Sequence, residues 1–583
     1  MTWRACRLAL ALLGLSVPAA PAFAGCILQK LAEMPVTIVA TRPLVSVQIN
    51  GVNTPLVADS GAFFSLLSSA SAAELKLKLY PAPFNLRLGG IGGDASARLT
   101  TVARFTFSGI TIPNVQFIVG GSEPGGSAAG VLGQNVLRIA DTEYDLADGV
   151  IRLMSPHGCG RAALAYWARS PTSPAVSALR IDPTTAASPW TIGTARLNGV
   201  PIRVLFDTGA SVSLLTLQAA ARAGVRPGRA GVVPAGLMHG IGRATTTTWI
   251  APFASLRIGN EQILHTRLRI GDVHVNAADM LLGLDFFLSH RIYVSNSQHR
   301  LYFTYNGGPV FNLDTSAAHA QVSAQPADAG GFARRGAALA ARREFAQALA
   351  ALTRACELVP DDPSYLYQRG LVYRDDQQPA LALADFNRAL ALRPDNVAVL
   401  VARAQLRLAV QANAGAVIGA DLDAAARYAP QQADIRLAIA DTYRLAGLPT
   451  PAIAQYTLWI AAHRDDARLA GALNGRCRAR TLAAHELDQA LADCNAALRR
   501  SPGAAPFLES RGLVRLRLGR RAQSIADFDA ALKQSPRRAW SLYGRGVDEL
   551  RGGMKLQGQR DIAVAVALSP AAVELAGAYG ITP

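Results

Sequence analysis

The chain has 583 residues, half of them apolar, and a formal net charge of +17. This length exceeds what a single apolar core fills, so several domains are expected, and the apolar content excludes a largely disordered chain. The charge comes from arginines scattered among alanine and leucine rather than gathered in a tract, so no nucleic-acid partner is expected.

Residues 1–24 have the pattern of a secretory signal peptide. Two arginines precede the apolar run from Leu8 to Val17, and Ala22-Phe23-Ala24 offers a small-x-small cleavage site. The run is too short to span a membrane, and no other run of roughly 18 apolar residues follows. We therefore predict a periplasmic or secreted protein. The alternative is a bacterial lipobox, in which a lipid on Cys26 would anchor the chain to a membrane.

Two strand-rich segments follow, residues 26–158 and 186–306. Both contain short apolar runs separated by turn residues and few helical periods, a pattern typical of β lobes. Residues 159–185 and 307–328 carry Pro, Ser, Ala and Gly in the proportions of linkers. The first half of the chain is thus expected to be all-β and bilobal.

Residues 329–583 change to alanine, leucine and arginine at helical spacing, and a period appears. Prolines recur at multiples of about 34 residues, at Pro360, Pro394, Pro430, Pro502, Pro536 and Pro570. Several of them follow the same small and aromatic residues, as in Gly370, Ala382, Phe386 and Ala389. This period resembles the tetratricopeptide (TPR) repeat, and about seven units fit. The resemblance implies an all-α solenoid that binds a protein partner.

The two β segments carry the same acidic turn. Asp59-Ser60-Gly61-Ala62 ends one apolar run, and Asp207-Thr208-Gly209-Ala210 ends another 148 residues later. An Asn-Gly hairpin signal precedes each acid, and an apolar-apolar-Gly segment follows each, at Val131–Gly133 and Leu281–Gly283. An acid after a buried strand is costly to desolvate unless its charge is shared. The duplication therefore predicts two carboxylates that meet across a pseudo-two-fold axis.

These motifs resemble the aspartic proteases, and the retroviral-type (retropepsin-like) branch in particular, over residues 35–306 with both lobes in one chain. The resemblance implies that Asp59 and Asp207 are catalytic, share one proton and activate a water that attacks a peptide carbonyl. It implies no cofactor and no metal. The residues that would support the dyad are Ser60, Gly61, Thr208, Gly209 and Ser211.

The resemblance also implies a glycine-rich flap over the cleft from each lobe. The expected flap residues are Gly90, Ile91, Gly92, Gly240, Ile241 and Gly242. Retroviral enzymes further carry an Asp after Gly-Ala, paired with an Arg after the later Gly. Here Phe63 and Ser211 stand at the acidic positions, and Gln134 and Leu284 at the basic ones. Both partners are missing together, so no unpaired charge is left, but the substrate contact of that Asp is lost.

Export would allow cysteine pairs to oxidise. Two pairs are candidate disulfides, Cys26–Cys159 and Cys477–Cys494. The second pair falls on facing positions of the two helices of one repeat, where the alternative is two small core cysteines. No cysteine has metal-site spacing.

Two functions of different classes fit these features. The first is an exported aspartic-type endopeptidase whose TPR array recruits or positions a polypeptide. The second is a non-catalytic peptide-binding scaffold in which Asp59 and Asp207 are structural. Intact acids in both lobes favour the enzyme, because buried unpaired acids are costly and binding does not require them. A glycosidase is disfavoured because its paired carboxylates need not follow a duplicated hydroxyl-Gly turn.

Overall fold

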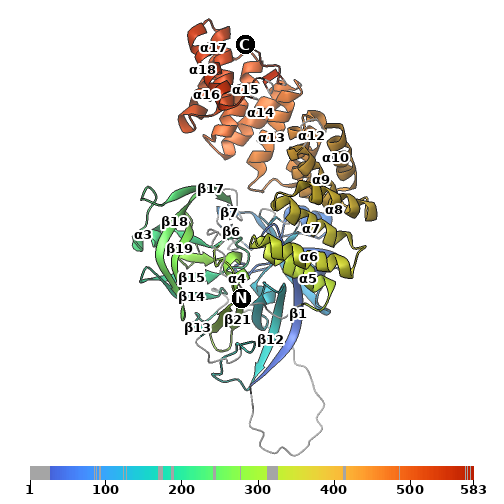
Figure 1. Cartoon of the computed structure of the whole chain (residues 1–583), viewed down its shortest axis with the longest axis vertical. Helices are drawn as coiled ribbons and strands as arrows, with labels where there is room; N and C mark the ends of the chain where they lie inside the picture. The colour runs from blue at the N-terminus through green and yellow to red at the C-terminus, as the bar shows by residue number, and fades with distance from the viewer. Residues whose placement is uncertain are drawn as a thin grey trace, which may run out of the picture.

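Two β lobes followed by an array of helices make up the computed structural model, in agreement with the predicted fold class (Figure 1). The predicted signal peptide lies outside the described residues. The structure describes residues 26–83, 86, 88–90, 93–121, 124–125, 128–168, 175–184, 189–239, 245–275, 277–311, 326–410, 415–484, 486–570, 573, 576–577 and 579–582.

Lobe 1 is a twisted set of strands in which the acidic turn follows a central strand. The hairpin of β2 (Arg42–Ile49) and β3 (Val52–Ala58) turns at Asn50-Gly51, where both residues have positive φ. β3 then runs parallel to β10 (Gly130–Leu132), which brings the apolar-apolar-Gly segment beside the acid. The other elements are β4 (Leu66–Leu67), α1 (Ser69–Glu74), β5 (Tyr80–Pro81), β6 (Leu88–Gly90), β7 (Gly93–Ala95), β8 (Ala97–Phe107), β9 (Ile110–Gly120) and α2 (Gln134–Leu137).

Lobe 2 repeats this arrangement. The hairpin of β14 (Ile192–Leu197) and β15 (Val200–Phe206) turns at Asn198-Gly199, and β15 runs parallel to β20 (Met280–Leu282). The remaining elements are β16 (Leu214–Thr216), α3 (Leu217–Arg222), β17 (Val233–His239), β18 (Thr245–Ile258), β19 (Glu261–Gly271) and α4 (Leu284–Ser289). The two lobes therefore present their acidic turns on equivalent strands.

A shared sheet joins the lobes. Its strand order is β13-β22-β21-β11-β12-β1, and β11 pairs antiparallel with β21 so that Tyr144 lies opposite Ile292. Its strands are β1 (Ile27–Val39), β11 (Asp141–Asp145), β12 (Val150–His157), β13 (Val176–Arg180), β21 (His290–Ser295) and β22 (Arg300–Tyr305). β13 lies inside the stretch predicted to be a linker. Its alternating buried pattern was hidden by the prolines and small residues around it, and its pairing with β22 settles its structure.

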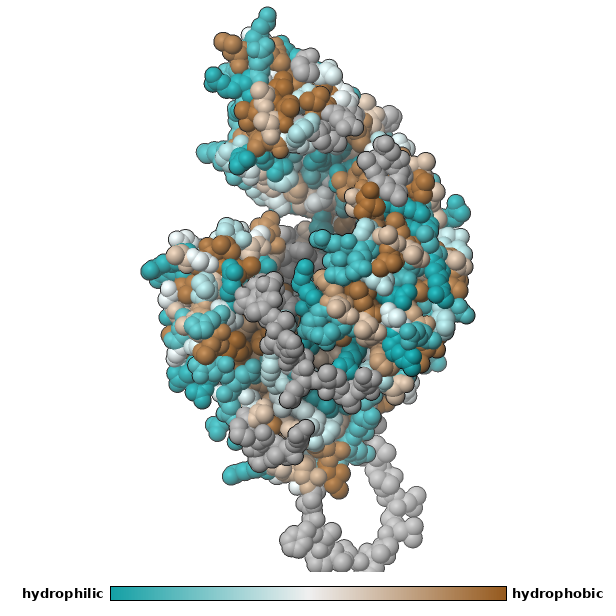
Figure 2. Space-filling model, viewed as in Figure 1, coloured by the Kyte–Doolittle hydropathy of each residue, from teal (hydrophilic) through white to brown (hydrophobic). Residues whose placement is uncertain are grey.

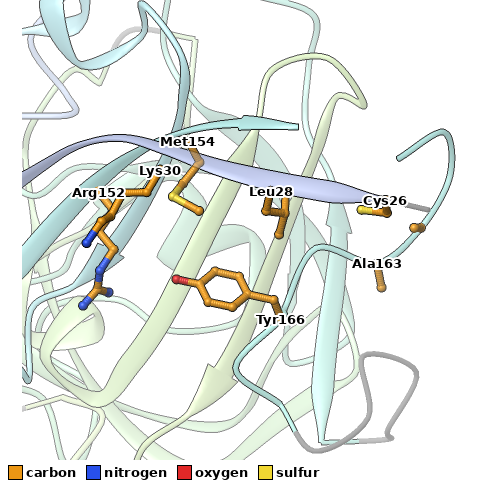
Figure 3. A pocket seen from close by; sticks show the side chains of 8 residues that line it. Cys26, Leu28, Lys30, Arg152, Met154, Ala163 and Tyr166 are labelled. Carbon is orange, nitrogen blue, oxygen red and sulfur yellow. The ribbon is translucent and has the colours of Figure 1, made fainter. Parts of the chain in front are cut away.

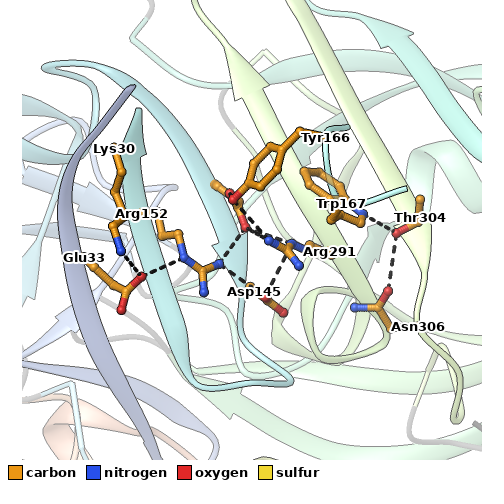
Figure 4. Close-up of polar contacts among 10 residues, drawn as sticks. Lys30, Glu33, Asp145, Arg152, Tyr166, Trp167, Arg291, Thr304 and Asn306 are labelled. Atoms are coloured by element: carbon orange, nitrogen blue, oxygen red, sulfur yellow. Dashed lines mark hydrogen bonds and ion pairs between the residues drawn. The ribbon is translucent and has the colours of Figure 1, made fainter. Parts of the chain in front are cut away.

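A buried charge cluster stabilises this sheet (Figure 4). Arg152 and Arg291 both bind Oε1 of Glu143, at 2.7 and 2.6 Å, and the Tyr166 hydroxyl donates to Oε2 at 2.6 Å. Asp145 pairs with both arginines, at 3.3 and 3.4 Å, and burial raises its pKa to about 6. Charge-assisted bonds to a fully buried carboxylate are strong, so the cluster ties together the hairpins of the two lobes.

The helical array contains seven antiparallel helix pairs in its described part. Its helices are α5 (Ala329–Ala341), α6 (Phe345–Leu358), α7 (Pro363–Asp375), α8 (Pro379–Leu392), α9 (Val397–Val410), α10 (Gly415–Tyr428), α11 (Ile435–Leu445), α12 (Pro449–Ala462), α13 (Leu469–Leu482), α14 (Leu487–Arg500), α15 (Ala505–Arg517), α16 (Arg521–Gln534), α17 (Ala539–Arg551) and α18 (Lys555–Leu568). None of the described helices is both long and apolar enough to cross a membrane.

Ion pairs within the repeats account for part of the scattered arginine. In five repeats an arginine of the first helix binds a buried aspartate of the second, with N–O distances of 2.5 to 2.7 Å. The pairs are Arg369–Asp385, Arg403–Asp421, Arg476–Asp493, Arg511–Asp527 and Arg545–Asp561. These arginines hold helix to helix, and the partner aspartate neutralises each of them.

Both candidate cysteine pairs are bonded in the structure. Cys26–Cys159 joins the start of β1 to the segment after β12, and Cys477–Cys494 joins α13 to α14. The second bond links the two helices of one repeat, which lie with those Cα atoms 5.6 Å apart. Covalent links at these positions reinforce contacts that packing already makes.

The helical array starts against lobe 1 and extends away from the two lobes (Figure 1). α5 packs on β1, and its Arg334 lies over the turn at Gly149. Further along, Asp465, between α12 and α13, accepts a hydrogen bond of 3.0 Å from Ser96, which directly precedes β8. In the space-filling view the surface is hollowed between lobe 2 and the array (Figure 2). The repeats therefore stand beside the part of lobe 1 that carries the β6–β7 ribbon.

Candidate active site

The two acidic turns face each other across the lobe interface. A Cβ atom added to Gly61 would lie 2.4 Å from Cγ of Asp207, and one added to Gly209 would lie 2.2 Å from Cγ of Asp59. Each carboxyl group therefore packs directly on the glycine of the opposite lobe, and only glycine leaves room for it. The structure brings together two acids that are 148 residues apart in the chain.

Backbone N–H groups fix one oxygen of each carboxyl group. Oδ1 of Asp59 accepts hydrogen bonds from the backbone of Gly61 and Ala62, at 2.9 and 2.8 Å. Oδ1 of Asp207 accepts the equivalent pair within its own turn, at 2.9 and 3.2 Å. The two carboxyl groups also hydrogen-bond to each other. The dyad is thus held rigidly before any substrate binds.

The environment favours a singly ionised dyad. Both side chains are only partly exposed, and burial is the main cause that raises the pKa of each. The negative charge of Asp59 raises the pKa of Asp207 further, well above its ordinary range. Two carboxyl groups this close cannot both ionise readily, so they titrate as one coupled pair and hold one proton between them.

Two buried hydroxyl groups lock the turns together. The backbone N–H of Ser60 donates to Oγ1 of Thr208 at 2.9 Å, and the N–H of Thr208 donates to Oγ of Ser60 at 2.9 Å. Each hydroxyl then donates to a carbonyl of the opposite lobe, Ser60 to Phe206 at 2.8 Å and Thr208 to Ala58 at 2.6 Å. All four bonds cross the lobe interface, so the hydroxyl residues fix the distance between the acids.

A second pair of side chains supports the turns from behind, and sequence reasoning gave it no such role. Oδ1 of Asn135 accepts from the N–H and hydroxyl of Ser65, at 2.7 and 2.8 Å. Asp285 makes the equivalent bonds to Ser213, at 2.9 and 2.7 Å, and burial raises its pKa to about 6. The signal available in the sequence was the repeat of these positions at an offset of 150.

Two further residues reach the dyad turns, and neither is predicted from the sequence. Arg42 donates from Nη1 to the carbonyl of Gly209, and Nε1 of Trp190 donates to the carbonyl of Gly61 at 2.8 Å. The two side chains differ in type but are 148 residues apart, the offset of the acids themselves. That shared offset was the signal that could have identified them.

The structure places some of the remaining residues singled out in the sequence, and the others lie outside the described residues. Ser211 is partly exposed beside its turn, and Phe63 packs against Phe64 with ring centroids 6.2 Å apart. Gly90 ends β6 and pairs with Gly93 in the β6–β7 ribbon. The remaining flap residues, Ile91, Gly92, Gly240, Ile241 and Gly242, lie outside the described residues. Gln134 has turned inward, and its amide donates to the carbonyl of Ser60 at 2.7 Å.

A cavity of about 790 Å³ lies beside β1 and β12, and no dyad residue lines it (Figure 3). Its lining is Cys26, Leu28, Lys30, Arg152, Met154, Ala162, Ala163 and Tyr166. Both of its cationic groups bind Glu33, at 3.0 and 2.8 Å, so neither charge needs a ligand. Within the described part of the chain, no group of three or more His, Cys, Asp or Glu side chains is placed to hold a metal ion.

Family models match both halves of the chain. Residues 45–136 match the aspartyl protease family, and residues 193–289 match the gag-polyprotein aspartyl protease family. Residues 363–396 and 481–539 match tetratricopeptide repeat families. No curated protein matches the sequence.

Solved structures of repeat proteins are similar to part of the chain. A tetratricopeptide repeat protein from Parabacteroides merdae ATCC 43184 has 16% identity and a TM-score of 0.35, over 43% of this chain and 98% of that chain. PilW, a widely conserved type IV pilus biogenesis factor, has 17% identity and a TM-score of 0.31, over 37% and 97%. YrrB, a TPR protein with an unusual peptide-binding site, has 13% identity and a TM-score of 0.22, over 39% and 97%.

The four hydrogen bonds that Ser60 and Thr208 make across the lobe interface lead to a prediction about stability. Thr208→Val should destabilise the lobes, because it leaves the buried N–H of Ser60 and carbonyl of Ala58 without partners, at about 1–3 kcal/mol for each group. Thr208→Ser should remain close to wild type, since Ser60 performs the same role in lobe 1. Thermal unfolding followed by circular dichroism compares the three proteins. A valine variant that melts with wild type would contradict this role for the hydroxyl.

Proposed function

We propose that this chain, which consists of two retropepsin-like aspartyl protease domains followed by TPR repeats, is an exported aspartic-type endopeptidase. The observation that carries the proposal is the dyad itself. Asp59 and Asp207 lie against each other's glycine, hydrogen-bond to each other and have raised pKa values. Paired acids that share one proton supply a base and an acid at the same place.

The proposed mechanism assigns one role to each member of the dyad. Burial and the repulsion between the two charges raise the pKa of the pair, so one carboxyl group keeps its proton while the other is ionised. The ionised member draws a proton from the attacking water, while the protonated member donates its proton to the carbonyl oxygen of the scissile peptide. Collapse of the resulting tetrahedral intermediate, with a proton passed to the leaving amine, breaks the peptide bond.

The TPR array is proposed to bind the polypeptide that the lobes cleave or a protein that delivers it. Repeat arrays provide an extended surface that is stable without a ligand. In this chain the array touches lobe 1 through Ser96 and Asp465, close to the β6–β7 ribbon. A polypeptide bound along the repeats would have a short path to the cleft.

A second candidate function is a non-catalytic peptide-binding scaffold made of the same parts. The matched family models and the repeats are compatible with it. The geometry of the dyad favours the enzyme. A scaffold gains nothing from two carboxyl groups held together at a desolvation cost, whereas the aspartic mechanism of proteolysis requires them.

Export as a lipid-free protein is also proposed. The disulfide between Cys26 and Cys159 supports it in two ways. Structural disulfides persist outside the reducing cytoplasm, and a sulfur atom in a disulfide cannot carry the thioether-linked lipid of a lipoprotein. The protein would then be periplasmic or secreted, with no membrane anchor at Cys26.

The enzyme is tested by Asp59→Asn and Asp207→Asn, each of which removes the shared proton or its acceptor. Cleavage of an unfolded protein substrate should fall by about 10³-fold in kcat/KM for either variant. Asp285→Asn is the matched control, because Asn135 already occupies the equivalent place in lobe 1 and this variant should still cleave.

The pH profile of the wild type completes this test. Activity should be lost at low pH, where the second proton removes the base, and again at high pH, where the shared proton is released. Because burial and mutual repulsion raise the upper apparent pKa, cleavage should persist above the ordinary aspartate range. Absence of cleavage at every pH, or cleavage at the wild-type rate by both Asn variants, would leave the scaffold as the function.

The proposed export without a lipid anchor predicts that Cys26 of the mature protein is disulfide-bonded to Cys159. Protein recovered from an exporting host and digested without reduction should yield a peptide pair linked through Cys26 and Cys159, as measured by mass spectrometry. Cys159→Ser should abolish that linked pair and serves as the control. Recovery of Cys26 with an attached diacylglyceryl group, in the membrane fraction, would show the lipoprotein alternative instead.

A further inference from the structure

The two sides of the dyad differ in the side chain that donates to the glycine carbonyl of the opposite turn. Arg42, the first residue of β2, and Trp190, just before β14, are 148 residues apart, as are Asp59 and Asp207. Arg42 donates to the glycine carbonyl of the lobe 2 turn, and Trp190 donates to the glycine carbonyl of the lobe 1 turn. Equivalent positions thus make equivalent cross-lobe bonds with side chains of different chemistry.

The pseudo-two-fold axis fixes where these side chains lie. The axis passes between the two carboxyl groups, since each packs on the glycine of the other lobe. Two residues related by that axis lie on opposite sides of it. An extended polypeptide with its scissile bond at the dyad has its N-terminal half on one side of the axis and its C-terminal half on the other. Arg42 and Trp190 therefore lie on opposite sides of a scissile bond held at the dyad.

The apolar walls behind the two turns share equivalent positions, although Phe63 and Phe64 pack against the lobe 1 wall only. In lobe 1 Val57 and Val131 form a buried cluster that Ala62 joins. In lobe 2 Leu205 and Leu281 form the equivalent cluster, which Ala210 joins. At the two positions that donate to the glycine carbonyls, the sides differ by the charge of Arg42 against the neutral ring of Trp190.

The bond to the glycine carbonyl does not explain why position 42 carries a charge. Trp190 makes the equivalent bond with a neutral donor, so the architecture requires a donor and not a cation. A guanidinium group has five N–H donors, and one of them satisfies the carbonyl of Gly209. Among the described residues, no carboxylate lies within ion-pair distance of Arg42; the acids whose charges act on it are Asp59 and Asp207.

Trp190 offers the opposite chemistry. Its single N–H is used by the carbonyl of Gly61, which leaves only the apolar ring for a substrate. That ring packs at the edge of the cluster formed by Ile192, Leu205, Val275 and Leu281, and it is itself partly exposed. A partly exposed aromatic ring on an apolar wall favours an apolar or aromatic side chain.

We infer that Arg42 and Trp190 give the cleft a direction, so that it prefers a polypeptide with an acidic side chain on one side of the scissile bond and an apolar side chain on the other. This inference rests on the proposed function and names its substrate class. A carboxylate on the substrate would use the free donors of a half-buried guanidinium, and bonds of this kind are stronger than neutral ones. A single chain can hold such an asymmetry, which two identical lobes could not.

The test is a cleavage-site profile of the full-length mature protein on a peptide library, read by mass spectrometry. Wild type should enrich Asp and Glu on one side of the cut only, with kcat/KM about tenfold higher for a Glu peptide than for its Gln counterpart. Arg42→Gln should bring that ratio close to one, and Arg42→Lys should retain part of it. The ratio compares two substrates of one protein, so a general loss of activity does not affect it.

A double variant that exchanges Arg42 and Trp190 tests the inference most directly. Arg42→Trp combined with Trp190→Arg should move the acidic preference to the other side of the scissile bond. If this double variant does not fold, the Glu-to-Gln ratios of Arg42→Gln and Arg42→Lys decide the question. An acidic preference on neither side or both sides of the cut, or a ratio that Arg42→Gln leaves unchanged, would overturn the inference while leaving the protease intact. A wild type that cleaves nothing would overturn the proposed function and this inference with it.

Discussion

The contact between each carboxyl group and the glycine of the opposite lobe is the constraint on which the site depends. It forces two like-charged groups together, which raises both pKa values, and it is possible only because no Cβ occupies the space. Four buried hydrogen bonds between Ser60, Thr208 and the opposite backbone oppose that repulsion. The repulsion that would separate the lobes is therefore the same interaction that keeps a proton available for chemistry.

Other parts of the molecule hold the two lobes together and so maintain that contact. The shared sheet joins the lobes through β11 and β21, and Glu143 is held there between Arg152 and Arg291. The helical array begins on β1, so lobe 1 supports both the dyad and the repeats. Arg–Asp pairs inside the repeats hold the array in shape independently of any ligand. Lobe 1 thus carries one acid of the dyad together with the repeats, an arrangement that suits the proposed enzyme.

Local signals in the sequence were enough to predict the lobes, the acidic turns and the repeats. The Asn-Gly hairpins, the strand ending at Asp59 and the 34-residue period each depend on neighbouring residues, and the structure contains all three. Contacts between the lobes could not be predicted from such local signals. Arg42, Trp190 and Glu143 gain their roles only from partners more than 100 residues away or in another strand, and β13 was hidden by its prolines. Their shared offsets were visible, but an offset does not show which way a side chain turns.

A titration of the two carboxyl groups themselves tests the central claim most directly. ¹³C-carboxyl-labelled aspartate can be followed by NMR across a pH series, with Asp59→Asn and Asp207→Asn used to assign the two resonances. The account predicts that both resonances respond in two linked steps, the upper one well above the ordinary aspartate range, and that either substitution leaves a single step for the remaining acid. Two independent single steps in the ordinary range would show that the carboxyl groups do not share a proton, and would contradict it.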